Sequence, residues 1–146
     1  MAFEPKTPYL AVDGIINLQD RKGNWLGVVL IERKYPPVGL ALPGGFVEVG
    51  ESVEEAIIRE MKEETGLDVI VLRQFRVYSE PDRDPRFHTV SVTFECVARG
   101  EPVGKDDARV ARVFGYDEIP FDRLVFDHGE ILGDYLKYPF AVFRKI

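Results

Sequence analysis

The chain has 146 residues, 45% of them hydrophobic and 30% charged, which is the balance expected of one compact domain over residues 1–146. Its net charge of −6 disfavours a general nucleic-acid-binding protein, because such proteins need a basic surface to neutralise phosphates. The apolar runs are too short to span a bilayer, and the first residues lack the layout of a secretory signal. We therefore expect a soluble cytoplasmic protein whose partner is a small molecule, with no role at a membrane.

The first third of the chain is expected to form a hairpin followed by a short strand. Residues Tyr9 to Leu18 and Trp25 to Arg33 are rich in apolar side chains, and a polar connection at 19–24 separates them. After a bend that contains two prolines, Leu40 to Leu42 is expected to be a further strand, closed by Pro43-Gly44-Gly45. The spacing predicts a β-hairpin with a long loop and a sharp turn behind it.

A helix is predicted by the strongest local signals in the sequence. Ser52 is a favourable N-cap and Glu55 stands three residues later, so the two residues form a capping box. Gly66 is a favourable C-terminal stop, because glycine adopts the left-handed conformation that ends many helices. Together these signals predict a helix from about Ser52 to Thr65.

The second half of the chain is expected to contain more strands than helices. A polar loop with prolines, Ser79 to Arg86, separates two strand-like segments. The expected elements are strands at Leu67 to Tyr78, Phe87 to Ala98 and Val110 to Tyr116, and a terminal helix at Gly129 to Leu136. Asp127 or His128 is expected to begin that helix. Hairpins combined with a helix between strands predict an α/β (α+β) fold, with a mixed sheet covered by helices.

Acidic residues interrupt the apolar face of the predicted helix after Ser52. Its apolar stripe consists of Val53, Ala56, Ile57 and Met61. Glu60 and Glu64 fall near the middle of this stripe and Glu63 lies at its edge. A buried carboxylate is costly unless it is paired or binds a metal, and two carboxylates at i and i+4 repel each other. A divalent cation offsets both penalties, whereas an ordinary charged helix neutralised by Arg59 and Lys62 is the alternative.

The residues around this helix carry a resemblance to a known family. From Gly45 the chain runs five residues to Glu51, seven more to Arg59, and then reads Arg-Glu-Met-Lys-Glu-Glu-Thr-Gly-Leu. This spacing resembles the Nudix box in every fixed position over Gly45 to Leu67. The resemblance implies an α/β/α sandwich around a mixed sheet. It also implies attack of water on a phosphorus of a nucleoside diphosphate linked to another group.

Several site residues follow from the same resemblance. Glu60 and Glu64 are expected to be ligands of Mg²⁺, or of Mn²⁺ in its place, with Glu63 as a further ligand or as the base. Gly45 is expected to offer its backbone carbonyl to the metal. Oxygen ligands of this kind suit Mg²⁺, which takes one or two carboxylates, several waters and substrate phosphates. Dimers are common in this family, and the sequence leaves a homodimer open.

The resemblance also implies a supporting ion pair and leaves the general base open. Glu51 and Arg59 are expected to hold the loop against the helix. The candidates for the base are Glu63, Glu64, Asp106, Asp107 and Glu118. The last three equally fit ordinary loop or surface carboxylates, since acidic residues are common in exposed connections.

The charged loop at residues 78–88 is the best candidate for contacting substrate. It contains Arg83, Arg86 and His88, and arginine matches phosphate oxygens through two parallel hydrogen bonds. An ordinary charged hairpin loop has a similar composition, and His88 also fits a structural residue of the next strand. Arg33 ends a strand just before the box and is a further phosphate-binding candidate, with a solvated strand end as the alternative.

Weaker features suggest which substrate is cut. Pro81 stands about fifteen residues beyond the box and, with residues 126–128, resembles the ADP-ribose pyrophosphatase branch of the family. That branch converts ADP-ribose to AMP and ribose 5-phosphate. The alternatives are a MutT-like hydrolase of nucleoside triphosphates or dinucleoside polyphosphates, and a non-catalytic nucleotide-sugar sensor, which the intact carboxylates disfavour. Phe3, Tyr9 and Phe46 are candidates for stacking on adenine, although such rings more often lie in the core.

Overall fold

The computed structural model describes residues 2–103 and 110–137 as a mixed sheet with two α-helices. The strands are β1 (Tyr9–Gln19), β2 (Trp25–Arg33), β3 (Gly39–Ala41), β4 (Gly44–Phe46), β5 (Ile70–Tyr78), β6 (Thr89–Arg99) and β7 (Val110–Phe114). The helices are α1 (Val53–Thr65), α2 (His128–Lys137) and the single 3-10 turn η1 (Phe121–Arg123). The base candidates Asp106 and Asp107 lie outside the described residues. No helix in the described part of the chain combines the length and apolarity needed to cross a membrane.

The strands form one sheet of order β3-β2-β1-β6-β5, in which β4 also pairs with β1 and β7 with β2. β1 and β6 run parallel along their whole length, and the other pairs are antiparallel. β3 and β4 are separated only by Leu42 and Pro43, yet β3 pairs with β2 and β4 pairs with β1. The chain therefore crosses from one strand to another at the start of the expected box.

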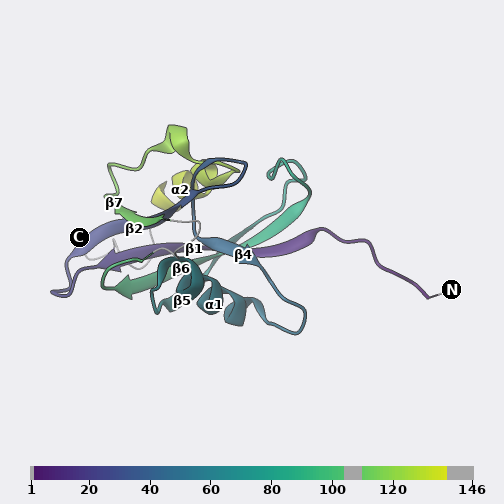
Figure 1. Ribbon diagram of the computed structural model, residues 1–146, viewed down its shortest axis with the longest axis horizontal. Helices are drawn as coiled ribbons and strands as arrows, with labels where there is room; N and C mark the ends of the chain where they lie inside the picture. Colours follow the sequence, from purple (N-terminus) through teal and green to yellow (C-terminus); the bar gives the residue numbers. More distant parts are fainter. Residues whose placement is uncertain (1, 104–109, 138–146) are drawn as a thin grey trace.

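The two α-helices cover opposite faces of the sheet, so the expected three-layer sandwich is confirmed (Figure 1). Side chains alternate between the two faces of a strand, and β1 follows this rule. Ile16 packs in a cluster with Ile57 and Met61 of α1, whereas Ile15 packs in a second cluster with Ile131 of α2. Each helix thus buries one apolar stripe against the sheet, which is the main source of stability for such an arrangement.

Helix α1 has the ends that the sequence predicted. Ser52 Oγ accepts a hydrogen bond from Glu55 N at 3.1 Å, and Glu55 Oε1 accepts one from Ser52 N at 3.2 Å. Gly66 ends the helix in the left-handed conformation, with φ of 72°, and its N–H donates to Lys62 O. An N-terminal cap such as Ser52 contributes about 1 kcal/mol to stability. Local interactions alone therefore determine where this helix begins and ends.

Elsewhere the structure differs from the sequence predictions at element boundaries. β5 begins at Ile70 instead of Leu67, because Leu67 is buried beneath the helix exit and its N–H donates to Thr65 Oγ1 at 3.2 Å. The sequence analysis missed β4, since Gly-Gly has low strand propensity and the strand forms only because β1 offers an edge. It also missed η1. The terminal helix is confirmed and begins at His128.

Candidate active site

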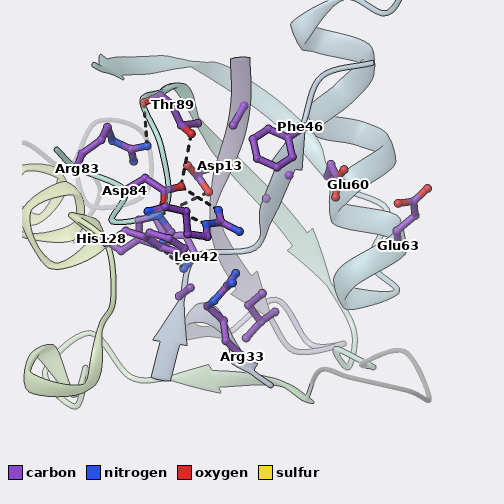
Figure 2. A pocket seen from close by; sticks show the side chains of 17 residues that line it. Asp13, Arg33, Leu42, Phe46, Glu60, Glu63, Arg83, Asp84, Thr89 and His128 are labelled. Atoms are coloured by element: carbon purple, nitrogen blue, oxygen red, sulfur yellow. Dashed lines mark hydrogen bonds and ion pairs between the residues drawn. The ribbon is translucent and has the colours of Figure 1, made fainter. Parts of the chain in front are cut away.

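A pocket of about 370 Å³ opens between the N-terminal half of β1, strand β4, helix α1 and the loop before β6. Figure 2 shows Glu60 and Glu63 on one side of it and the group of Asp13, Arg83, Asp84, Thr89 and His128 on the other. The sequence-predicted residues that line the pocket are Arg33, Gly45, Glu60, Glu63, Arg83 and Arg86. The pocket thus brings candidates from four different segments of the chain together.

Helix α1 directs its carboxylates toward β4, as the helical spacing predicted. Glu60 is 8% exposed and Glu64 is 4% exposed, whereas the side chain of Glu63 is 44% exposed. Glu64 Oε1 accepts the N–H of Gly44 at 2.7 Å, so this carboxylate holds the backbone just before Gly45. Two buried carboxylates one helical turn apart are costly to keep ionised in an apolar layer, and a cation between them would offset that cost.

The backbone of Gly45 lies directly against the carboxylate of Glu60. A Cβ atom built on Gly45 would overlap the carboxylate of Glu60, so a larger residue here would displace that carboxylate. Within the described residues, no three His, Cys, Asp or Glu side chains form a complete metal cluster. Mg²⁺ does not require one, because it completes its shell with waters and phosphates. The oxygens of Glu60, Glu64 and the Gly45 backbone therefore suit this ion.

Arg59 connects the loop before α1 to the carboxylates. Its Nε and Nη2 atoms donate to the two oxygens of Glu51 at 2.6 and 2.9 Å, and Nη2 also donates to Phe46 O at 3.1 Å. Its Nη1 atom donates to Glu60 at 2.8 Å and to Glu63 at 3.3 Å. The hydrogen bonds from Arg59 lower the pKa of Glu51 to about 2. Glu51 is therefore ionised at neutral pH. Arg59 does not line the pocket, but it contacts Glu60 and Glu63, which do.

The three arginines of the opposite wall have different surroundings. The side chain of Arg83 is only 4% exposed, and it donates to both oxygens of Asp127 at 2.8 and 2.6 Å. Arg86 is more exposed and donates to Asp84 at 3.0 and 2.9 Å. Arg33 Nε donates to Pro37 O at 2.8 Å. Arg83 therefore joins the charged loop to the start of α2, whereas Arg33 and Arg86 present guanidinium groups at a more open part of the wall.

Among the described metal, base and phosphate candidates, three do not line the pocket, and one of them, Glu64, instead contacts the backbone N–H of Gly44. The ring of His88 is bonded across its own loop, with Nε2 donating to Ser79 O at 3.0 Å, and His88 does not line the pocket. Glu118 is exposed in a turn after β7, where its N–H donates to Gly115 O. The structure therefore does not bring His88 together with the three arginines, nor Glu118 together with the carboxylates of α1.

The sequence analysis missed a buried polar group in the pocket wall. Asp13 lies on the α2-facing side of β1 and accepts a short hydrogen bond from Ser91 Oγ, and its Oδ1 is 3.7 Å from His128 Nε2. Burial raises the pKa of Asp13 to about 6 and lowers the pKa of His128 to about 3, so the ring is neutral. The same rule that singled out Glu60 applied to Asp13, a carboxylate inside an apolar strand.

A second missed feature is Phe126, which has φ of 56° although it is not glycine. Residues held in this region cost about 1–3 kcal/mol each and cluster at functional sites. The guanidinium carbons of Arg33 and Arg86 lie 4.9 and 5.3 Å from the centre of its ring. Phe126 lines the pocket and thus supports both of the more open arginines.

Aromatic side chains gather at the edge of the pocket. Tyr9, Phe46 and Phe87 are 58%, 40% and 39% exposed, so these rings lie outside the core. The ring centre of Tyr9 is 4.6 Å from that of Phe87 and 5.8 Å from that of Phe46. Phe46 itself lines the pocket, which makes the three rings a continuous apolar rim. Phe3 is 89% exposed and is not among the lining residues.

Known proteins resemble this chain along most of its length. The family model described as the NUDIX domain matches residues 8–135. The ADP-ribose pyrophosphatase of Methanocaldococcus jannaschii is 48% identical over 134 residues, which cover 90% of this chain and 75% of that protein.

Two solved structures share the fold. The MutT/nudix family protein from Enterococcus faecalis has a TM-score of 0.75 and 29% identity, covering 95% of this chain and 65% of that one. A bifunctional NMN adenylyltransferase/ADP ribose pyrophosphatase from Francisella tularensis, complexed with AMP and a Mn ion, has a TM-score of 0.76 and 27% identity. The match covers 94% of this chain and 43% of that protein.

Proposed function

The chain belongs to the Nudix family, and on this premise we propose that it hydrolyses ADP-ribose to AMP and ribose 5-phosphate with Mg²⁺. The observation that carries the choice of substrate is the 48% identity to an ADP-ribose pyrophosphatase across 90% of the chain. The pocket supports the chemistry, because carboxylates on one wall face guanidinium groups on the other. A diphosphate between these walls would meet a bound cation on one side and arginines on the other.

The metal is proposed to bind beside α1. Glu60 and Glu64 supply buried carboxylates, and Gly45 supplies backbone that approaches Glu60 directly. When bound, Mg²⁺ neutralises phosphate oxygens and lowers the pKa of a bound water. Glu63 is proposed to accept the proton of the attacking water, since its side chain is the most exposed of the three. The Mn ion in the Francisella structure supports a divalent metal in a protein of this fold.

The diphosphate is proposed to bind along the arginine wall. Arg33 and Arg86 are placed to donate to phosphate oxygens, because both line the pocket and both side chains are partly exposed. Arg83 is proposed to contribute positive potential while it remains paired with Asp127. The pocket volume of about 370 Å³ falls within the usual range for small-molecule sites. Positioning and charge stabilisation are what phosphoryl transfer chiefly demands of a protein.

The apolar rim is proposed to contact the adenine. Tyr9, Phe46 and Phe87 offer exposed ring faces next to a pocket whose interior is mainly charged. A base stacked on aromatic side chains gains about 1–3 kcal/mol, and stacking tolerates different bases. The rim therefore accounts for the nucleoside half of the substrate, and the arginine wall accounts for the diphosphate.

The test is a hydrolysis assay with Mg²⁺ against ADP-ribose, sugar nucleotides, dinucleoside polyphosphates, NADH and nucleoside triphosphates, with products separated by chromatography. We expect the highest kcat/KM for ADP-ribose, AMP and ribose 5-phosphate as products, and complete loss of activity with a chelator. Faster cleavage of a nucleoside triphosphate would overturn the choice of substrate. No cleavage of any compound with any divalent metal would overturn the enzymatic function.

A further inference from the structure

The turn between β3 and β4, residues 41–45, is held by three different elements. Leu42 N donates to His128 Nδ1 of α2 at 2.9 Å, and Gly44 N donates to Glu64 Oε1 of α1 at 2.7 Å. Pro43 O accepts from Gly14 N of β1 at 2.9 Å. Proline has no N–H, so the two donors on either side of Pro43 are each bound by a side chain from a different helix.

Contacts at both nitrogen atoms of the His128 ring fix its orientation. Nδ1 accepts the N–H of Leu42, so Nε2 carries the proton and faces Asp13 Oδ1 at 3.7 Å. Asp13 is itself held by the hydroxyl of Ser91. This is not a catalytic Ser-His-Asp set, because Ser91 donates to Asp13 and a backbone N–H occupies the ring nitrogen that a nucleophile would need. All three side chains are buried, so this group is a rigid support.

The turn has little freedom to move without these bonds being broken. A Cβ on Gly44 would overlap Val12 O and the carboxylate of Asp13, so its backbone is packed tightly against β1. A Cβ on Gly45 would instead meet only the carboxylate of Glu60. Residues 42–44 are therefore restricted by contacts with β1, α1 and α2. A change in the backbone orientation of Leu42 would be transmitted along this short segment to Gly45.

We propose that His128 is a positioning residue for the metal site, which orients the backbone of Gly45 through the N–H of Leu42. The inference rests on the proposed function, because it takes Gly45 and Glu60 as parts of that site. Residues that orient metal ligands typically change metal affinity ten- to a hundredfold when they are mutated. Helix α2 thus takes part in metal binding through the N–H of Leu42. A buried histidine that merely satisfies its hydrogen bonds would affect folding and leave metal affinity unchanged.

The test measures Mn²⁺ binding to the substrate-free protein by electron paramagnetic resonance, so the readout does not depend on activity. His128→Leu removes the acceptor for Leu42 N, and we expect the dissociation constant to rise roughly tenfold or more. His128→Asn places an oxygen near the position of Nδ1, and we expect it to restore affinity to within about threefold of the wild type. Tyr135→Phe is the control in the same helix, because it removes a buried hydroxyl that donates to Glu95 and accepts from Asn17 Nδ2, without touching the turn.

Three outcomes would overturn the proposal. A folded His128→Leu variant that binds Mn²⁺ as tightly as the wild type would do so, as would an equal loss in Tyr135→Phe. If His128→Leu does not fold, His128→Gln replaces it. The side-chain carbonyl of glutamine lies one bond farther from the backbone than Nδ1, so it does not match the position of the acceptor for Leu42 N. Unchanged Mn²⁺ affinity in His128→Gln would then overturn the proposal.

The Glu64→Gln variant separates this inference from the proposed function. Mn²⁺ binding that is lost in Glu64→Gln but retained in His128→Leu would refute only the role of His128. A wild-type protein that binds no Mn²⁺ would refute the metal site itself and the inference with it.

Discussion

The Oε1 atom of Glu64 accepts a hydrogen bond from the backbone N–H of Gly44 at 2.7 Å, which joins the last turn of α1 to the first residue of β4. The two residues are twenty positions apart in the chain, and the bond fixes the approach of Gly45 to Glu60. Glu64 therefore has a structural role in addition to the proposed role as a metal ligand. The two roles depend on different properties, since the hydrogen bond needs only an acceptor oxygen, whereas the negative charge of the carboxylate is what strengthens its attraction for a cation.

Replacing Glu64 with glutamine should separate these roles. The side-chain carbonyl of glutamine can still accept the N–H of Gly44, so we expect a melting temperature close to that of the wild type. The loss of a charged ligand should lower kcat for ADP-ribose by roughly a hundredfold or more. Steady-state kinetics and thermal unfolding of the same preparation test both expectations. Near-normal turnover would move the essential role to another carboxylate.

Adding a methyl group at Gly45 should disturb the pocket directly. In Gly45→Ala the new Cβ overlaps the Glu60 carboxylate and displaces it, so we expect a small change in stability and a strong loss of activity. Gly133→Ala is the control, because a Cβ on this α2 residue meets nothing within 4 Å. Alanine is also the better helix former, so the control should be as stable as the wild type or slightly more stable. Urea unfolding and activity assays measure both variants.

Arg59→Ala should lower stability and activity together. The substitution removes both hydrogen bonds to Glu51 and the bonds to Phe46 O and Glu60, so the loop before α1 loses its attachment. Arg59→Lys keeps the charge but lacks the planar group that binds both carboxylate oxygens, and we expect it to rescue only part of the loss. An unchanged melting temperature in Arg59→Ala would contradict the structural role.

The ion pair of Arg59 with Glu51 should also appear in the pH dependence of stability. The folded-state pKa of Glu51 is lowered to about 2 from its ordinary value of 4.5, so the unfolded state binds more protons between these values. Its contribution to stability is present above pH 4.5 and is lost as pH falls toward 2. Urea unfolding at several pH values below 5 should give a shallower decline for Glu51→Gln than for the wild type. Parallel curves would show that the pair is not formed in solution.

Arg83 and Arg86 should differ sharply although both line the pocket. Arg83→Ala leaves Asp127 unpaired in a mostly buried position, and breaking a buried pair costs about 3–5 kcal/mol. Arg86→Ala removes the more exposed guanidinium and leaves Asp84 with its hydrogen bonds from the backbone N–H of residue 86 and from Thr89, so we expect a smaller loss of about 1–3 kcal/mol. Its main effect should be a KM for ADP-ribose raised about tenfold or more, through loss of a charged hydrogen bond. Equal stability losses in the two variants would refute the distinction.

The sequence by itself determined the parts of this protein that depend on neighbours within a few residues. The capping box of Ser52 and Glu55 and the left-handed Gly66 are local, so the limits of α1 could be predicted before any fold was known. The helical period also placed Glu60 and Glu64 on the buried face, where the structure has them. These predictions succeeded because helix ends and helix faces are set by hydrogen bonds and spacing along a single segment.

Only the tertiary structure decided which distant groups meet. Asp13, Ser91 and His128 come from three elements, and only the sheet and α2 bring them together. β4 exists because β1 supplies an edge, and Arg83 is paired with Asp127 because α2 begins beside the charged loop. Such contacts depend on how strands pair and helices pack, which local propensity does not encode. The tertiary structure therefore assigned each arginine its surroundings and revealed the role of α2 in the pocket wall.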